Sequence, residues 1–211
     1  MKIDIFFDTI CPWCRIGKQF MMQALESWQG EEVEVRYRAF MLDANVPLEG
    51  RDYSIVIEQF GGKARTDQMF AQVCKIGESC GLHFDFNRIG YMPNTLLSHQ
   101  LIKLAPNEQK SEISDLIAKA YFEDGLDLGD LEVVVGIANT AGLDAPSIRT
   151  QLLNKATVAD IEKDISFAAK AGIRSVPYFI INDRYSIQNP QSADTFLQAF
   201  KQIQLEQGAS K

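Results

Sequence analysis

The chain of 211 residues has no long apolar run, no block of Lys and Arg, and only two histidines. Its apolar runs, such as residues 176–181, fall far short of the ~20 residues that a membrane-spanning helix needs, so we expect no membrane partner. Acidic residues outnumber basic ones by 28 to 21 and the net charge is -7, which argues against the basic surface that binds nucleic acid.

The first residues do not have the pattern of a secretory signal peptide. Residues 3–8 carry two acidic side chains and are too few to form the apolar region of a signal peptide. We therefore expect the protein to be cytoplasmic, where thiols are kept largely reduced. In that compartment its four cysteines are expected to be catalytic, metal-binding or buried, and not to form a disulfide framework.

Alternating and helical spacings organise the two ends of the chain. Residues 2–7 and 33–39 alternate as half-buried strands do, and the residues between them have helical spacing. A helix that joins consecutive strands predicts a βαβ unit with parallel strands. The pattern near the other end predicts a helix, a hairpin and a last helix over residues 158–169, 178–187 and 192–203.

The segment between these ends is helical almost throughout. Asp130 is a predicted N-cap, and Asn94 is predicted to cap a helix that runs to Pro106. We interpret the whole pattern as an α/β domain made of residues 1–40 and 156–211, interrupted by an all-helical insertion of residues 41–155.

A Cys-x-x-Cys motif, Cys11-Pro12-Trp13-Cys14, follows the first predicted strand and opens the first predicted helix. Unpaired backbone N–H groups and the helix dipole favour an anion there, so we expect Cys11 to react as a thiolate. Cys14 lies one turn later on the same side, and Pro12 suits the first helical position. The motif predicts dithiol–disulfide exchange, with Cys11 as the exposed nucleophile and Cys14 as the cysteine that resolves the mixed disulfide.

A structural zinc site or inert cysteines are the alternatives for this pair. Zinc needs a second close pair of ligands, and Cys74, Cys80, His83 and His99 match no usual spacing, so we expect no metal. On a continuous helix Cys74 and Cys80 lie ~9 Å apart along the axis and point in different directions. We therefore expect them to be packing residues and not a disulfide.

Pro177 follows Val176 at the start of the strand predicted over residues 178–181. An X-Pro bond tolerates the cis form there, and such a bend can turn the backbone of Val176 outward to bond an extended substrate. An ordinary trans proline at a strand start is the alternative.

The Cys11–Cys14 motif and Ser175-Val176-Pro177, placed around a helical insertion, resemble the thioredoxin-fold oxidoreductases of the DsbA superfamily. More narrowly, the chain is similar to the FrnE-like branch, which shares its architecture with 2-hydroxychromene-2-carboxylate isomerases and kappa-class glutathione transferases. Supporting stretches are residues 38–42, 47–50, 94–99, 120–122 and 172–179. The resemblance implies a thioredoxin domain, a cis bond before Pro177, and Cys11 and Cys14 as the redox pair.

The chain departs from this family at two places that can reshape the substrate groove. Ser175 stands where the branch usually has Gly, and Asn189-Pro190-Gln191 stands where it tends to have Gly-Ala-Gln. Between the cysteines, DsbA itself carries a His whose charge can stabilise the thiolate. Trp13 cannot do this by charge, so we expect a milder or more reducing redox pair than that of DsbA.

Asn94 and His99 are candidate substrate contacts. His99 lies on a predicted helix, where it can face the active site and bind substrate or shuttle a proton. The alternative is that His99 is simply hydrogen-bonded inside the fold. Asn94 likewise has two interpretations, a helix cap or a substrate contact.

The sequence therefore predicts a thiol–disulfide oxidoreductase of thioredoxin fold that acts on protein or small-molecule thiols and disulfides, as a monomer or homodimer. No bound cofactor is expected beyond an external thiol–disulfide couple such as glutathione. One alternative is a glutathione-dependent isomerase or transferase, in which the thiol of glutathione is the reagent and Cys14 is unnecessary. The other is a redox-linked chaperone (a holdase) whose apolar insertion binds clients.

Overall fold

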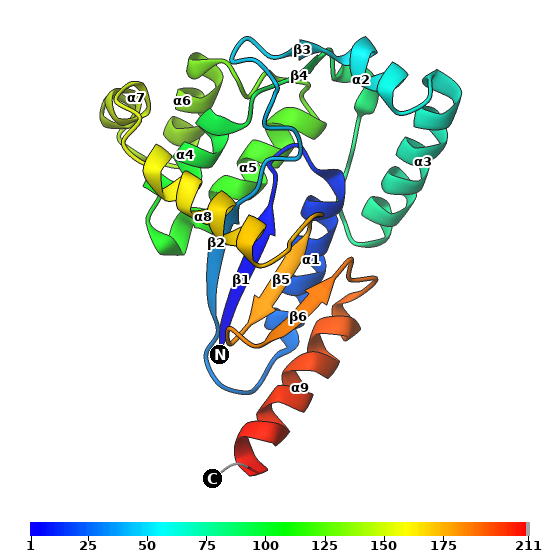
Figure 1. Ribbon diagram of the computed structural model, residues 1–211, viewed down its shortest axis with the longest axis vertical. Coiled ribbons are helices and arrows are strands. Elements are labelled where there is room, and N and C mark those ends of the chain that lie inside the picture. Colours follow the sequence, from blue (N-terminus) through cyan, green and yellow to red (C-terminus); the bar gives the residue numbers. More distant parts are fainter. Residues whose placement is uncertain (210–211) are drawn as a thin grey trace.

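A four-stranded sheet forms the centre of the computed structural model, which describes residues 1–209 (Figure 1). The strands, in the sheet order β2-β1-β5-β6, are β2 (Glu34–Ala39), β1 (Lys2–Phe7), β5 (Tyr178–Ile181) and β6 (Tyr185–Gln188). β1 pairs in parallel with β2 and antiparallel with β5. The predicted βαβ unit is therefore confirmed.

The hairpin of β5 and β6 is also confirmed. Its two turn residues, Asn182 and Asp183, have positive φ angles of 50° and 55°. Asn and Asp tolerate this left-handed conformation better than other residues with a side chain, and two such residues in succession match the right-handed twist of the flanking strands.

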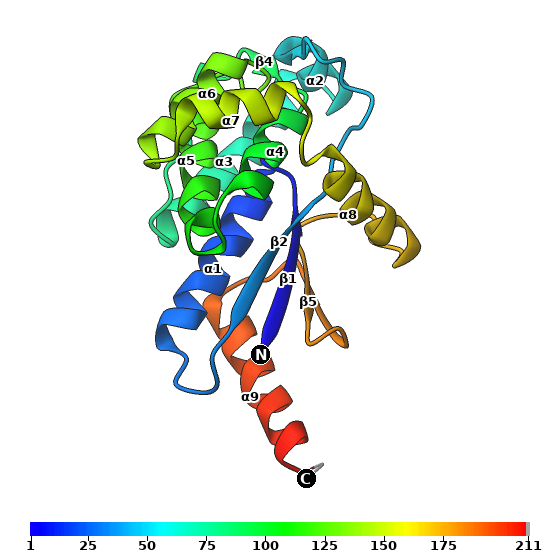
Figure 2. The ribbon, with the colours of Figure 1, turned by 90° about the vertical axis from the view of Figure 1, so that its left-hand side faces the viewer.

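Helices cover both faces of the sheet. α1 (Pro12–Ser27) and α9 (Ala193–Ala209) lie together on one face, while α8 (Val158–Lys170) lies on the other (Figure 2). The remaining helices gather above the sheet: α2 (Tyr53–Gln59), α3 (Lys63–Ser79), α4 (Leu96–Leu104), α5 (Lys110–Phe122), α6 (Leu131–Thr140) and α7 (Ala145–Leu153). Within residues 1–209, no helix combines the length and the apolar character needed to cross a membrane.

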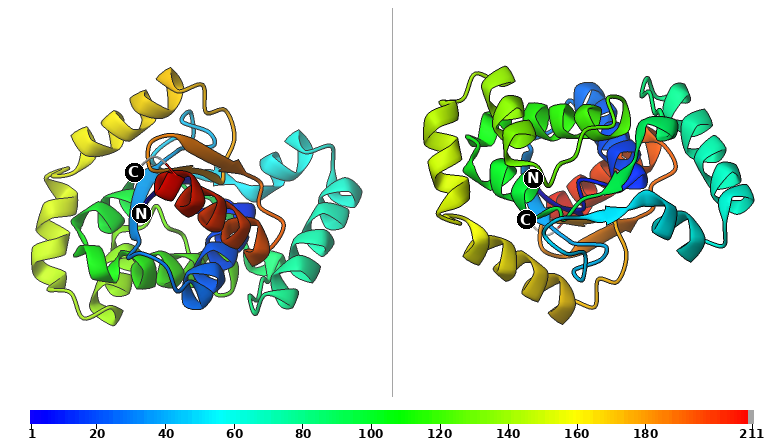
Figure 3. Two further views of the ribbon diagram at one scale, coloured as in Figure 1. Left: turned by 90° about the horizontal axis from the view of Figure 1, so that it is seen from below. Right: turned by 90° about the horizontal axis from the view of Figure 1, so that it is seen from above.

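Seen from above, α2 and α3 lie on one side of the start of α1, and α4 to α7 lie on the other side (Figure 3). The segment 41–155 also contains two short antiparallel strands, β3 (Arg51–Asp52) and β4 (Tyr91–Met92), which the all-helical interpretation did not include. Two residues are too few to show an alternating pattern. One hydrophobic core runs through the sheet, α1 and the helices above, and the domain boundaries at residues 40 and 156 stay a prediction.

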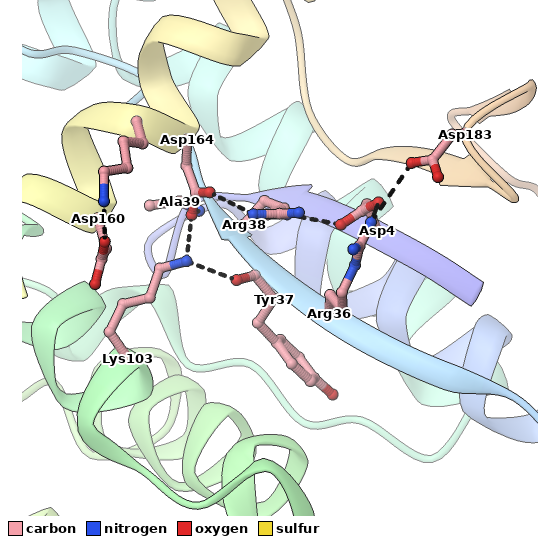
Figure 4. Close-up of polar contacts among 10 residues, drawn as sticks. Asp4, Arg36, Tyr37, Arg38, Ala39, Lys103, Asp160, Asp164 and Asp183 are labelled. Carbon is pink, nitrogen blue, oxygen red and sulfur yellow. Dashed lines mark hydrogen bonds and ion pairs between the residues drawn. The ribbon is translucent and has the colours of Figure 1, made fainter.

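Buried ion pairs fasten α8 and α4 to the edge strand β2 (Figure 4). Asp164 on α8 is 3% exposed and accepts hydrogen bonds from Arg38 at 3.0 Å and from the Ala39 N–H at 2.9 Å. The same carboxylate pairs with Lys103 on α4, and Arg38 also donates to Asp4 at 2.6 Å. A buried carboxylate is tolerated only with such partners, so this cluster fixes where α8 lies on the sheet.

Candidate active site

Cys11 ends the loop that joins β1 to α1. Its backbone is extended (φ -90°, ψ 111°), Pro12 is the first helical residue, and the Cys14 N–H donates a hydrogen bond to Cys11 Sγ at 3.4 Å. Cys11 is therefore the N-cap of α1. The motif opens the helix, as its place in the sequence predicts.

Cys11 is not the exposed residue that we expected, since it is only 4% exposed. As the N-cap it lies at the helix end, where its sulfur meets the Val176 carbonyl oxygen. Cys11 instead lines a cavity of about 390 Å³, which also touches Trp13, Val56 on α2 and Phe70 on α3. We call this the apolar cavity, and it is the space from which a substrate can reach the sulfur.

Cys14 lies deeper, at 3% exposure, and both cysteines are free thiols. Burial, and then the hydrogen bond and charge of neighbouring Cys11, raise the pKa of the Cys14 thiol well above its usual value. Cys14 is therefore held as a protonated thiol. The part of the rise that comes from the hydrogen bond and charge of Cys11 is lost when the Cys11 sulfur is bound in a disulfide.

The segment before β5 lies directly against Cys11. The Val176–Pro177 peptide bond is cis, and the Cys11 thiol donates to the Val176 carbonyl oxygen at 3.8 Å. We expected the backbone of Val176 to face outward toward a substrate. Its carbonyl group instead faces Cys11, because the chain approaches α1 closely at this point.

Gly17 makes that close approach possible. It lies in α1, and a Cβ atom there would stand 2.9 Å from Cγ of Pro177 and 3.5 Å from the ring of Phe179. The 2.9 Å separation is too short for two carbon atoms and would force a displacement, whereas 3.5 Å is an ordinary contact. A glycine inside a helical pattern indicates such a close contact, but Gly17 was not among the residues predicted to belong to the site.

We expect Gly17→Ala to destabilise the protein, although alanine in place of glycine normally favours a helix by about 1 kcal/mol. The new methyl group would push Pro177 away from α1. Gly136 in α6 is the matched control, because nothing lies within 4 Å of its added Cβ. Urea unfolding should show a loss for Gly17→Ala and a gain for Gly136→Ala. Equal gains for both variants would contradict the contact.

A second cavity of about 310 Å³ lies on the other side of Trp13. It is lined by Trp13, Pro177 and the triplet Asn189-Pro190-Gln191, and we call it the hairpin cavity. Trp13 is 36% exposed and borders both cavities. The triplet at which the chain departs from the family it resembles therefore lines a groove beside the Cys11–Cys14 motif.

Asn94 and His99 do not line either cavity. His99 is 2% exposed, and its Nε2 donates to the Phe40 carbonyl oxygen at 3.2 Å. Asn94 accepts a hydrogen bond from the Leu96 N–H at 3.0 Å and donates to the Val46 carbonyl oxygen at 2.7 Å. The N-cap of α4 is Thr95, one residue after the predicted Asn94, which is half-buried. His99 is hydrogen-bonded inside the fold, as its alternative interpretation has it, and neither set of contacts supports a role in binding substrate.

Two charged side chains beside Cys14 were missed from the sequence. Asp8 is 2% exposed and accepts a hydrogen bond from the Leu42 N–H at 2.7 Å. Lys18 is 4% exposed and pairs with Asp115 at 2.6 Å; burial lowers the Lys18 pKa and Asp115 opposes that shift. The available signal was an acid three residues before the motif and a lysine on the apolar face of the following helix.

The other cysteines lie in α3 and at its end. Cys80 is buried and Cys74 is half-buried; both are free, and burial raises the pKa of both thiols. Packing, as predicted, describes Cys80 well. Among residues 1–209, no three His, Cys, Asp or Glu side chains come together as a metal site.

A family model described as a DSBA-like thioredoxin domain matches residues 2–201. The chain belongs to this family. The thioredoxin-like fold and the DsbA resemblance predicted from the sequence are thereby confirmed. Members of the DsbA-like family are thiol oxidoreductases or isomerases.

Known members differ in how much they share with this DsbA-like chain. A probable DsbA oxidoreductase from Streptomyces coelicolor has 27% identity and a TM-score of 0.86, over 96% of this chain and 89% of that one. The uncharacterized protein YwbO of Bacillus subtilis is 24% identical over 87% of this chain and 88% of its own length. The cytosolic disulfide reductase DsbM from Pseudomonas aeruginosa, solved with GSH, shares the fold at 14% identity and a TM-score of 0.68, over 98% of this chain and all of that one.

Proposed function

We propose that this DsbA-like chain is a thiol–disulfide oxidoreductase whose redox centre is Cys11-Pro12-Trp13-Cys14. The observation that carries the proposal is the N-cap position of Cys11, with the Cys14 N–H on its sulfur and a cavity in front of it. A helix N-terminus favours an anionic sulfur, and the thiolate is the form that attacks disulfides.

In the proposed cycle, the Cys11 thiolate attacks one sulfur of a substrate disulfide. The substrate S–S bond breaks, one substrate thiolate leaves and takes a proton from water, and Cys11 is left in a mixed disulfide. Cys14 then loses its proton to solvent and attacks Cys11 Sγ, which releases the second substrate thiol. The substrate gains two electrons, and the pair becomes a Cys11–Cys14 disulfide that an external thiol such as glutathione reduces again.

The same steps in reverse oxidise a substrate dithiol, so the redox potential of the pair sets the direction. The proposal keeps the cytoplasmic setting expected from the sequence, in which reduction of substrate disulfides is the favoured direction. Trp13 lends the pair no positive charge. We therefore expect a potential more reducing than the roughly -120 mV of the strongly oxidising DsbA.

Equilibration in glutathione buffers of graded ratio, followed by alkylation and mass spectrometry, tests this proposal. We expect one intramolecular disulfide, between Cys11 and Cys14, with a midpoint potential clearly below about -120 mV. Cys74→Ser should leave the titration unchanged, because Cys74 lies outside the pair. A cysteine pair that never oxidises would contradict the assignment as an oxidoreductase. A midpoint potential near that of DsbA would contradict the expected direction, the reduction of substrate disulfides.

A further inference from the structure

The apolar cavity has a buried floor and an exposed rim. Its floor is formed by side chains that are almost completely buried: Val56, Val73, Tyr121 and Phe122 are exposed by 5% or less. The rim is formed by Trp13, Leu42, Phe60 and Met69, all exposed by 36% or more. Its volume of about 390 Å³ lies within the range of pockets that bind small molecules.

Charge is missing from this cavity. None of the described residues that line it is Asp, Glu, Lys, Arg or His, although charged residues make up 23% of the chain. A carboxylate group that entered it would lose its hydration and find no opposite charge. The cavity therefore favours an uncharged occupant.

Stacked aromatic rings form one wall. Phe70 on α3 lies parallel to Phe86, with ring centroids 3.9 Å apart, and stacks on Tyr53 at 6.3 Å. Burial raises the pKa of Tyr53 to about 12, so its hydroxyl is uncharged at neutral pH. Flat apolar groups pack well against such a wall, because aromatic pairs stabilise stacked or edge-on contacts.

We propose that the apolar cavity binds the uncharged aromatic part of a small thiol or disulfide and so presents its sulfur to Cys11. This inference rests on the proposed function only for the chemistry at Cys11. The reaction is the exchange described above: the substrate disulfide is reduced to two thiols, the cysteine pair is oxidised, and an external thiol restores it. Substrates that carry carboxylates on the ring are excluded by the uncharged lining.

Binding is tested without redox chemistry in the Cys11→Ser/Cys14→Ser double variant, by calorimetry with 2-naphthol and 2-naphthoate. The two probes share a ring system and differ in charge at neutral pH. We expect 2-naphthol to bind at least about tenfold more tightly than 2-naphthoate. Equal affinities, or no binding of 2-naphthol, would overturn the proposal.

Rim variants locate the binding site. Met69→Glu on α3 and Leu42→Glu in the loop after β2 place a carboxylate on the rim, and each should weaken 2-naphthol binding about tenfold. Ile55→Glu is the matched control, because Ile55 is 48% exposed on α2 but lines no part of the cavity. A loss in Ile55→Glu equal to that in both rim variants would place the ligand elsewhere.

The kinetic arm uses the reduced wild-type protein with 2,2′-dithiodipyridine and its carboxylated analogue 6,6′-dithiodinicotinate. The rate at which each disulfide reacts with the protein is divided by the rate at which the same disulfide reacts with N-acetylcysteine. This ratio removes the intrinsic difference in reactivity between the two disulfides. We expect a preference of about tenfold or more for the uncharged disulfide, and Met69→Glu should lower the rate with that disulfide about tenfold. A disulfide-linked peptide with Phe beside its Cys that reacts faster than 2,2′-dithiodipyridine would assign the cavity to protein substrates and overturn the proposal.

The two arms separate this inference from the proposed function. If 2-naphthol binds as expected but wild-type protein turns over no disulfide, the cavity assignment holds and the oxidoreductase assignment fails. If disulfides are turned over without regard to charge and 2-naphthol does not bind, the oxidoreductase stands and the substrate class is wrong.

Discussion

Replacing Cys11 by Ser is expected to lower disulfide turnover by roughly three orders of magnitude or more. A serine hydroxyl at the helix N-terminus is not ionised at neutral pH, so the attack on the substrate disulfide is lost. Insulin reduction at a fixed concentration of glutathione measures the effect. Cys80→Ser is a suitable control because Cys80 is also buried and free but packs at the end of α3.

Cys14→Ser should behave differently from Cys11→Ser. It keeps the attacking sulfur but cannot resolve the mixed disulfide, so substrates should stay covalently attached to Cys11. Mass spectrometry of the trapped species from a lysate would then identify natural substrates. Unchanged turnover by Cys11→Ser would refute the redox assignment.

Cys11→Ser and Cys14→Ser also distinguish the proposed oxidoreductase from its two alternatives, the glutathione-dependent isomerase or transferase and the holdase. Full turnover of a glutathione-dependent reaction by Cys14→Ser would favour the isomerase or transferase, which needs no second cysteine. Suppression of client aggregation that survives the loss of both cysteines would favour the holdase.

Asp164→Asn is expected to destabilise the protein by about 2 to 4 kcal/mol, the second large effect. The substitution removes the negative charge that Arg38 and Lys103 share, and it leaves both cations beside a buried site (Figure 4). The lower part of that range allows for Arg38, whose side chain is 33% exposed and partly solvated. Urea unfolding with a constant slope measures the change in the free energy of unfolding.

Asp160→Asn provides the control on the same helix. Asp160 pairs with Lys163 at 2.8 Å on the exposed side of α8 (Figure 4), and exposed pairs contribute little. We therefore expect its unfolding curve to match that of the wild-type protein. An Asp164→Asn curve that also matches would show that this cluster does not fix α8.

The features that the sequence predicted well depend on short stretches of chain. Alternation over β1 and β2 and helical spacing through α1 could be read directly, and the Cys-x-x-Cys motif needs only the turn that follows β1. The features that were missed depend on distant segments. Gly17 meets Pro177, and Asp164 meets Arg38 and Lys103, only after the chain has folded.

The burial of Cys11 and the presence of the apolar cavity also depend on distant segments of the chain. A helix N-terminus gives a sulfur its electrostatic surroundings, but the cavity in front of Cys11 is lined by residues of α2 and α3, far along the chain. Periodicity alone does not tell whether an apolar side chain such as Phe60, Phe70, Phe84 or Phe86 belongs to the core or to a groove. The structure separates them, because Phe84 is buried in the core while the other three line the cavity.

Trp13 borders both cavities, and this position has a practical consequence. The chain has only one other tryptophan, Trp28, which lies at the far end of α1 against Phe200. A Trp28→Phe background would leave a single indole at the redox motif. Its emission spectrum would then serve as an optical sensor of sulfur oxidation state and cavity occupancy, readable in real time without an added dye.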